Sequence, residues 1–267
     1  MELTIIPDQD HDLSNLRDDK TVLKNPHKGW YVHYVDNGFT RPFYRDSIPA
    51  GDHLADVPGL NHLYIRFDWQ DVEPAEGKWN WRPIDEIIRE WAPYGYRFAL
   101  RLCTYEVNSH LEYATPAWVC AAGAAGRRIE RISAFDGQPE CCWEPDYGDP
   151  VFLARLENLM RAYGAHYNGH PLIEFVDVGT FGTFGEGHTG GGNGRQYDAA
   201  VIKRHIDLHT RYFPDTRLLV NDDMLRHPAG GEQVFQLAQY CAGLGLGIRD
   251  DSALVAGCAN TAIFTTG

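Results

Sequence analysis

The chain has 267 residues, of which 43% are hydrophobic, and it carries a formal net charge of -13 at pH 7. This length fits one large α/β domain or two small ones, with enough apolar residues to bury a sizeable core. The acidic balance argues against nucleic acid or an anionic membrane as partner, and favours a neutral or cationic small ligand.

Targeting and cysteine patterns add little chemistry. Residues 1–10 lack the regions of a secretory signal, and no apolar run approaches the ~20 residues that a membrane span needs. We therefore expect a cytoplasmic protein, or a secreted one if a signal peptide has been removed. The six cysteines show no zinc-ligand spacing and no CxxC motif, so free thiols are predicted, with Cys103 and Cys241 buried.

Apolar segments with polar ends alternate with amphipathic segments along the chain. The strands are predicted at residues 29–35, 63–67, 96–104, 173–178, 217–220 and 244–248. The clearest helix is Pro150–Tyr167, with Asp149 as its N-cap and apolar residues repeating on one face. The other helices are predicted at residues 82–91, 196–212 and 231–242.

This alternation predicts a parallel sheet with helices outside it. The carboxyl ends of parallel strands meet at one rim, and chemistry at that rim is the pattern of a (β/α)8 barrel. The predicted fold class is therefore α/β, a TIM barrel with about six βα units, in one catalytic-type domain over residues 1–267. A closed barrel needs two more units, so the chain is expected to be incomplete at its C-terminus; an open sheet is the alternative.

The most informative segment is residues 172–188, LIEFVDVGTFGTFGEGH. It begins as a buried strand and breaks up into four glycines, which present Glu186 and His188 at the strand end. A carboxylate on backbone that only glycine tolerates is a way for a barrel enzyme to place an acid or base. The alternative interpretation is a flexible glycine loop with a solvated glutamate.

A second motif lies upstream in residues 69–85, WQDVEPAEGKWNWRPID. Its order of Trp, Glu-Pro-x-Glu-Gly, Trp-x-Trp and Ile-Asp resembles the segment after the second strand in clan-A glycoside hydrolases, with the β-galactosidase-like families closest. With NPHKGWY at 25–31 and WEPDYGDP at 143–150, the chain resembles a bacterial branch of this group. The resemblance covers residues 25–252 and implies a retaining glycosidase with a TIM-barrel fold.

The resemblance also implies roles for carboxylates. In that clan an acid/base glutamate ends the fourth strand, which corresponds to Glu186 here, and a nucleophilic glutamate ends the seventh. The clan usually has Asn before the acid/base residue, whereas this chain has Gly185. No seventh strand is found, so the nucleophile is expected beyond residue 267, and residues 1–267 alone are expected to show weak or no glycosidase activity. An inverting arrangement with another strand-end carboxylate is the alternative, from Asp222, Asp223, Asp250 or Asp251.

Substrate-binding candidates follow from position near strand ends. Arginine in a barrel strand can orient a neighbouring carboxylate and lower its pKa, and tryptophan can stack on a sugar ring. Each type also has a structural explanation, as a packing ion pair or as core filler. The candidates are Trp30, Arg66, Asp68, Trp69, Arg101, Tyr105, Trp143, His188, Asn221 and Asp222.

Metal binding is the competing chemistry. His205 and His209 have the i, i+4 spacing that can hold zinc on a helix, but no Glu follows His205 and the pair is expected on a solvated helix surface. The glycine run at 190–194 lacks the Lys-Ser/Thr ending of a phosphate loop, and is interpreted as a lid beside Glu186. No metal and no cofactor is therefore predicted.

The sequence thus predicts a glycoside hydrolase that acts on a saccharide through Glu186, without a nucleic-acid or membrane partner. Two alternatives stay open: a carbohydrate-binding barrel without catalysis, and a metal-dependent barrel hydrolase that uses strand-end Asp and His residues. The sugar, its linkage and the oligomeric state do not follow from the sequence.

Overall fold

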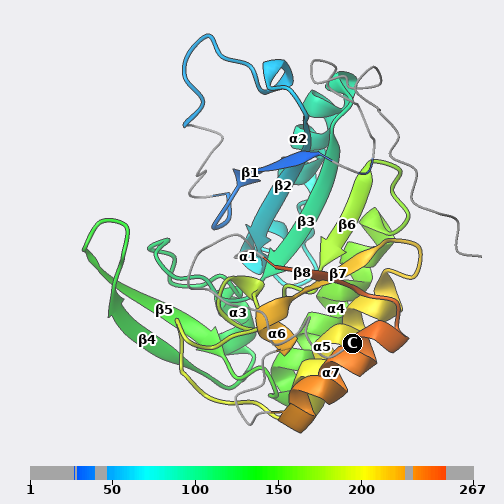
Figure 1. The fold of residues 1–267 in the computed structure, drawn as a ribbon. Coiled ribbons are helices and arrows are strands. Elements are labelled where there is room, and N and C mark those ends of the chain that lie inside the picture. The colour runs from blue at the N-terminus through cyan, green and yellow to red at the C-terminus, as the bar shows by residue number, and fades with distance from the viewer. Residues whose placement is uncertain (1–26, 28, 40–46, 226–230, 251–267) are drawn as a thin grey trace, which may run out of the picture.

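The fold is described by a computed structural model for residues 27, 29–39, 47–225 and 231–250. Its centre is a six-stranded sheet whose strands follow one another in chain order and pair in parallel (Figure 1). The strands are β1 (Trp30–Val35), β2 (Leu60–Asp68), β3 (Arg97–Cys103), β6 (Ile173–Asp177), β7 (Leu218–Asn221) and β8 (Gly247–Arg249).

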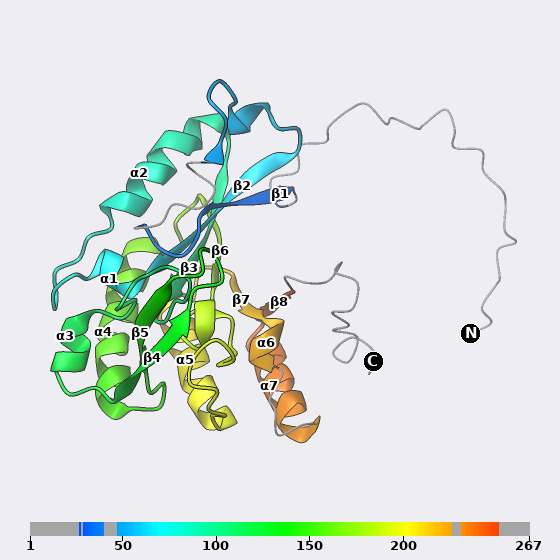
Figure 2. The same ribbon diagram turned by 90° about the vertical axis from the view of Figure 1, so that its left-hand side faces the viewer.

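Four longer helices lie on one side of this sheet and follow its curve (Figure 2). They are α2 (Arg82–Trp91), α4 (Pro150–Tyr167), α5 (Ala199–Tyr212) and α7 (Gly231–Gly243). The shorter elements sit in the connections: η3 (Leu54–Asp56), α1 (Trp69–Val72), η4 (Ala92–Tyr94), α3 (Ala117–Ala121), η5 (Thr183–Gly185) and α6 (Asp222–Leu225). An antiparallel hairpin of β4 (Gly126–Ile132) and β5 (Pro139–Pro145) is inserted between β3 and α4.

The two faces of the sheet differ chemically because side chains alternate along each strand. On β2, Leu63, Ile65 and Phe67 join the main hydrophobic core together with buried residues of α2 and α4. The residues between them, such as Tyr64 and Arg66, belong to the other face. There Tyr64, with Ala99 and Phe175, forms a small apolar cluster. Charged side chains follow this cluster toward the carboxyl ends of the strands.

The predicted α/β class with a parallel sheet is confirmed. All six predicted strands are present, and α2 and α4 have the predicted bounds. Asp149 caps α4 by accepting a hydrogen bond from the Phe152 amide (2.8 Å). β8 is shorter than predicted because Leu244 lies in the turn that ends α7, where its amide donates to the Tyr240 carbonyl (3.1 Å). Within the described residues β1 and β8 form the two edges of the sheet, and no closed barrel is seen.

The prediction of a solvated histidine pair on α5 is wrong. His205 and His209 are fully buried. The ring of His205 bonds the Thr180 hydroxyl (2.9 Å) and the Tyr147 carbonyl (3.0 Å). Burial lowers the pKa of both histidines to about 4, so they are neutral at pH 7. The reason is the helical period, which places positions 202, 205, 206 and 209 on the inward face.

The cysteine prediction is confirmed for the part of the chain that the structure covers. Cys103 and Cys241 are buried and free, and Cys141 and Cys142 are also unbridged. Cys258 lies outside the described residues, as does Asp251. Neither a group of three or more metal-ligating side chains nor a helix long and apolar enough to cross a membrane occurs in the described segments.

Candidate active site

Charged side chains gather on the second face of the sheet, at the carboxyl ends of β1, β2, β3 and β6. The strand register brings them together, because Arg66 of β2 pairs with Arg101 of β3, which in turn pairs with Asp177 of β6. Residues in register on neighbouring strands point to the same face and lie side by side. The name strand-end cluster is used below for Asp36, Arg66, Asp68, Arg101, Glu106, Asp177 and Glu186.

Asp177 anchors the strand-end cluster. Its Oδ2 lies 3.2 Å from Nε and 3.1 Å from Nη2 of the fully buried Arg101. The Tyr64 hydroxyl donates to the same oxygen, and Arg249 Nε is 3.3 Å away. Burial raises the pKa of Asp177, against the opposing effect of Arg101 and Tyr64. This ion pair fixes the direction of the Arg101 guanidinium.

Arg101 then holds Glu186 with its remaining nitrogen. Its Nη1 donates to Glu186 Oε1 (3.1 Å) and to the Phe184 carbonyl (3.1 Å). Arg66 Nη1 is 3.7 Å from the same carboxylate oxygen. About 16% of the Glu186 side chain is exposed, so a ligand can reach a carboxylate that is otherwise enclosed by two arginines.

His188 completes the surroundings of Glu186. Its Nδ1 accepts a hydrogen bond from the Gly190 amide (3.2 Å), so in the neutral ring the hydrogen is on Nε2. That Nε2 is 3.6 Å from Glu186 Oε2. Burial raises the pKa of Glu186, but His188, Arg101 and Arg66 together outweigh burial and hold it below its usual value. Glu186 is therefore ionised in the free protein.

The glycines before Glu186 have a local physical cause. A Cβ at Gly179 would come within 2.5 Å of the Arg101 side chain, so any larger residue would displace that arginine. Gly185 has φ of +68°, and a Cβ there would lie 2.3 Å from the Gly179 carbonyl oxygen. A side chain such as Asn at position 185 would therefore clash with this backbone.

Two further strand-end carboxylates, Asp36 and Glu106, lie on the other side of Arg66. Its Nε is 2.9 Å from Asp36 Oδ1 and 3.5 Å from Glu106 Oε1, and its Nη2 donates to Asn37. Burial opposes ionisation of Asp36, but His33 and Arg66 lower its pKa. Both carboxylates follow a strand end by one to three residues, which is the sequence signal that could have identified them.

Glu106 and Asp68 are the two most enclosed acids of this group. Burial raises the pKa of Glu106 to about 7, with Arg66 acting against it. Burial, Glu106 and Asp71 raise the pKa of Asp68. Both groups therefore favour the protonated form more than an exposed acid does.

Replacing Glu106 by Gln is expected to change how stability depends on pH. A raised pKa means that the folded state keeps a proton which the unfolded chain releases, from the ordinary value of 4.5 up to about 7. Stability of the parent protein therefore falls as pH rises through this window, and Glu106→Gln should lack that contribution to the fall. Urea midpoints of both proteins, measured from about pH 5 to about pH 8, test this. A difference between them that stays constant with pH would show that Glu106 is ionised throughout.

Asn221 and Asp222 lie at the next strand end. Asn221 ends β7 and is buried, and its side-chain oxygen accepts a hydrogen bond from the Asp223 amide (3.0 Å). Asp222 is buried at the start of α6. Of the predicted binding residues, the structure brings Arg66, Asp68, Arg101 and His188 to the surroundings of Glu186, with Asn221 and Asp222 one strand further along.

The three predicted sugar-stacking tryptophans do not lie in the strand-end cluster. Trp30 is 72% exposed, but it begins β1 and so lies at the opposite end of the sheet. Trp69 is fully buried and donates to Glu73 (2.7 Å). Trp143 is buried on β5, against Tyr113. Tyr105 is buried as well, and its hydroxyl bonds the Gly191 carbonyl (3.3 Å). Trp69, Trp143 and Tyr105 are thus packed in the core or against the hairpin, and Trp30 is exposed at the other end of the sheet.

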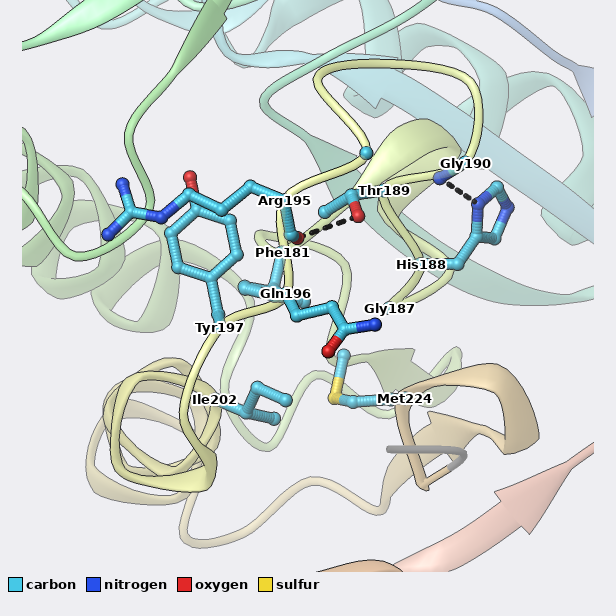
Figure 3. A pocket seen from close by; sticks show the side chains of 11 residues that line it. Phe181, Gly187, His188, Thr189, Gly190, Arg195, Gln196, Tyr197, Ile202 and Met224 are labelled. Atoms are coloured by element: carbon cyan, nitrogen blue, oxygen red, sulfur yellow. Dashed lines mark hydrogen bonds between the residues drawn. The ribbon is translucent and has the colours of Figure 1, made fainter. Parts of the chain in front are cut away.

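A cavity of about 230 Å³ opens beside His188. The side chains of Gln196, Ile202 and Met224 converge on it from the loop, α5 and α6 (Figure 3). The loop that forms its rim is tied by the Thr189 hydroxyl, which donates to the Arg195 carbonyl (2.9 Å). His188 thus faces Glu186 with one ring nitrogen and lines a cavity with mixed polar and apolar walls.

The fold and the site together define an α/β domain with a charged site at the carboxyl edge of a parallel sheet.

No protein-family model and no curated protein sequence matches the chain. Solved structures similar to this chain include three xylanases. A psychrophilic glycoside hydrolase family 10 endo-β-1,4-xylanase has 16% identity and a TM-score of 0.45, over 80% of this chain and 60% of that chain. Xylanase B from Clostridium stercorarium F9 has 17% identity and a TM-score of 0.42, over 72% of this chain and 53% of that chain. Xylanase XynB from Paenibacillus barcinonensis has 14% identity and a TM-score of 0.45, over 81% of this chain and 57% of that chain. The chain thus spans 60% or less of the length of these three proteins.

Proposed function

We propose that this chain is a glycoside hydrolase domain that acts on a saccharide, with Glu186 as its catalytic carboxylate. The observation that carries the proposal is the setting of Glu186: partly exposed, at a strand end, held by Arg101, Arg66 and His188. The motifs at 69–85 and 172–188 support the same function through their resemblance to clan-A glycoside hydrolases. A sheet with helices on one face and charged groups on the other also suits the wall of a (β/α)8 barrel.

The lowered pKa of Glu186 bears on its role in the proposed reaction. In a retaining cycle the acid/base residue first donates a proton to the leaving group while a second carboxylate forms a bond to the glycosyl group, and it then accepts a proton from the water that hydrolyses that bond. The free protein holds Glu186 in the ionised form that the second step uses. We propose that bound substrate displaces the contacts of Glu186 with His188 and Arg66, which are the longer ones, so that the pKa of Glu186 rises and it takes up a proton from solvent before the first step.

A carbohydrate-binding domain without catalysis is the second candidate. It is favoured by one observation: Asp36 and Glu186 both contact Arg66 and are each about 15% exposed, and the pKa of each is lowered. Two ionised carboxylates accept hydrogen bonds from sugar hydroxyls well, but neither is ready to donate a proton. The acids of the strand-end cluster with raised pKa values, Asp68, Glu106 and Asp177, are buried.

Hydrolysis and binding measurements separate the two candidates. Full-length protein, including any sequence that follows residue 267, is tested for nitrophenol release from 4-nitrophenyl β-galactoside, β-glucoside and β-xyloside, and for binding of the corresponding methyl glycosides by calorimetry. Release that depends on Glu186 supports the glycosidase. Binding without release supports the non-catalytic domain, and the absence of both contradicts a saccharide function.

A further inference from the structure

An exposed indole, Trp79, stands on the helical side of the fold, away from the strand-end cluster. It stacks on Trp81 with a ring separation of 6.1 Å and an angle of 7°. Trp81 stacks in turn on the buried Tyr163 (5.8 Å, 18°) and on His166 (5.5 Å, 18°). Trp79, 38% exposed, is therefore the outer end of an aromatic stack that begins in the core.

A groove of about 510 Å³ lies beside Trp79, between the turn after α1, helix α3 and helix α4. Its volume falls within the ~300–1,000 Å³ that small-molecule sites occupy. The groove shares no residue with the cavity beside His188. The residues that line it are Glu73, Glu76, Gly77, Trp79, Trp118, Asn158, Arg161, Ala162 and Ala165.

The walls of this groove are fixed by buried contacts. Trp118 packs edge-on against the buried Trp69 (6.0 Å, 89°), and its indole nitrogen donates to the Glu73 carbonyl (3.1 Å). The Glu73 carboxylate accepts hydrogen bonds from Trp69 (2.7 Å) and from the Gly77 amide (2.8 Å). Both lining indoles are thus held in place before a ligand arrives, which reduces the entropy lost on binding.

Polar side chains of both charges stand around the indoles. Asn158 and Arg161 project from α4, with Arg161 Nη1 donating to Asn158 Oδ1 (3.1 Å). Glu76 lies on the turn and contacts Arg155 (2.5 Å). A guanidinium, an amide and a carboxylate offer both donors and acceptors with little net charge. This lining suits a neutral, hydroxyl-rich ligand better than a phosphate or a cation.

We propose that the groove beside Trp79 is a second saccharide-binding site. It takes a neutral oligosaccharide, with the C–H face of one pyranose ring on the Trp79 indole and hydroxyls on Asn158, Arg161 and Glu76. The site lies on the helical side and so holds a chain of sugars without taking part in bond cleavage. The choice of a saccharide as ligand rests on the proposed function, whereas the shape and lining of the groove do not depend on it.

Fluorine NMR tests the site directly. The full chain carrying Glu186→Gln, which prevents consumption of the ligand, is labelled with 5-fluorotryptophan, and the resonance of Trp79 is identified with Trp79→Phe. Cellohexaose and xylohexaose are added to millimolar concentration. At least one of them is expected to shift the Trp79 resonance. A Trp79 resonance that neither sugar moves overturns the proposal.

Calorimetry then measures the contribution of each wall. Trp79→Ala is expected to weaken binding of the sugar that shifts its resonance by about tenfold, the size of an aromatic stacking contact. Asn158→Ala, which leaves the aromatic stack intact, should also weaken it. Tyr94→Ala removes another exposed aromatic ring outside the groove and should have no effect. Equal loss in all three variants would overturn the proposal. Because no step uses Glu186, the site can stand if glycosidase activity is absent, and can fail if activity is present.

Discussion

Replacing Glu186 by Gln lowers turnover of an aryl glycoside by about 10²–10⁴-fold, the usual size of a general acid–base contribution. Gln keeps the shape of the side chain and an oxygen that can accept from Arg101, so the fold and the affinity for the sugar should change little. The effect should therefore appear in kcat rather than in KM. Steady-state kinetics of the full-length enzyme, including any sequence that follows residue 267, on the glycoside that it hydrolyses best provides the measurement.

Glu174→Gln is the matched control for this prediction. Glu174 lies near the other end of the same strand, β6, and also pairs with an arginine, Arg97 (2.5 Å). Its replacement should leave turnover close to that of the parent. Turnover of Glu186→Gln close to the parent value would remove Glu186 from the mechanism.

The pH profile distinguishes the two roles of Glu186. A base must be ionised, so kcat/KM would fall as pH drops through the pKa of the free enzyme; an acid must be protonated, so it would fall as pH rises through it. His188→Ala removes one of the groups that lower the pKa of Glu186, so the limb that belongs to Glu186 should move to higher pH.

Replacing Arg101 by Met destabilises the fold by about 3–5 kcal/mol, the cost of leaving a buried partner charge unpaired. Asp177 is 2% exposed and receives two contacts from Arg101. Tyr64 and Arg249 remain but do not replace a guanidinium on the neighbouring strand. Urea unfolding followed by circular dichroism gives the free energy.

Two further variants identify the cause of this loss. Arg101→Met combined with Asp177→Asn removes the buried charge and should recover much of the stability. Arg82→Met, whose i, i+4 pair with Glu86 is solvent-exposed, should change stability by only about 0.3–0.5 kcal/mol. If Arg101→Met costs no more than Arg82→Met, the pair with Asp177 does not stabilise the fold.

Local signals predict much of the architecture. Helix α4 follows from its Asp149 cap, its first-turn proline and its apolar period, and β3 follows from a nearly continuous apolar run. The β4–β5 hairpin was missed because its strands are mostly polar, and β4 is exposed or half-buried along its length. Its position depends on contacts with distant loops, such as the Asn193 amide that donates to Glu144 (2.6 Å).

Whether each tryptophan side chain is buried or exposed could not be predicted from its position in the sequence alone. Trp69 and Trp79 lie ten residues apart near the same strand end, yet one is fully buried and the other partly exposed. Glu73 stabilises the buried position of Trp69, because its carboxylate accepts a hydrogen bond from the indole N–H inside the fold. A ring near a strand end can pack inward or outward, and only the neighbours that surround it select one.

The sequence by itself determined the order of the strands and helices, and it placed Glu186 after β6, because both depend on hydrophobic period and on glycine backbone within one segment. Only the tertiary structure decided the charge state of the site. Arg66, Arg101 and Glu186 are separated by 35 and 85 residues in the chain, and they meet because neighbouring parallel strands bring them to one edge. A pKa depends on the charges and the burial within a few ångströms, so the lowered pKa of Glu186 and the raised pKa of Glu106 arise only when these strands are assembled.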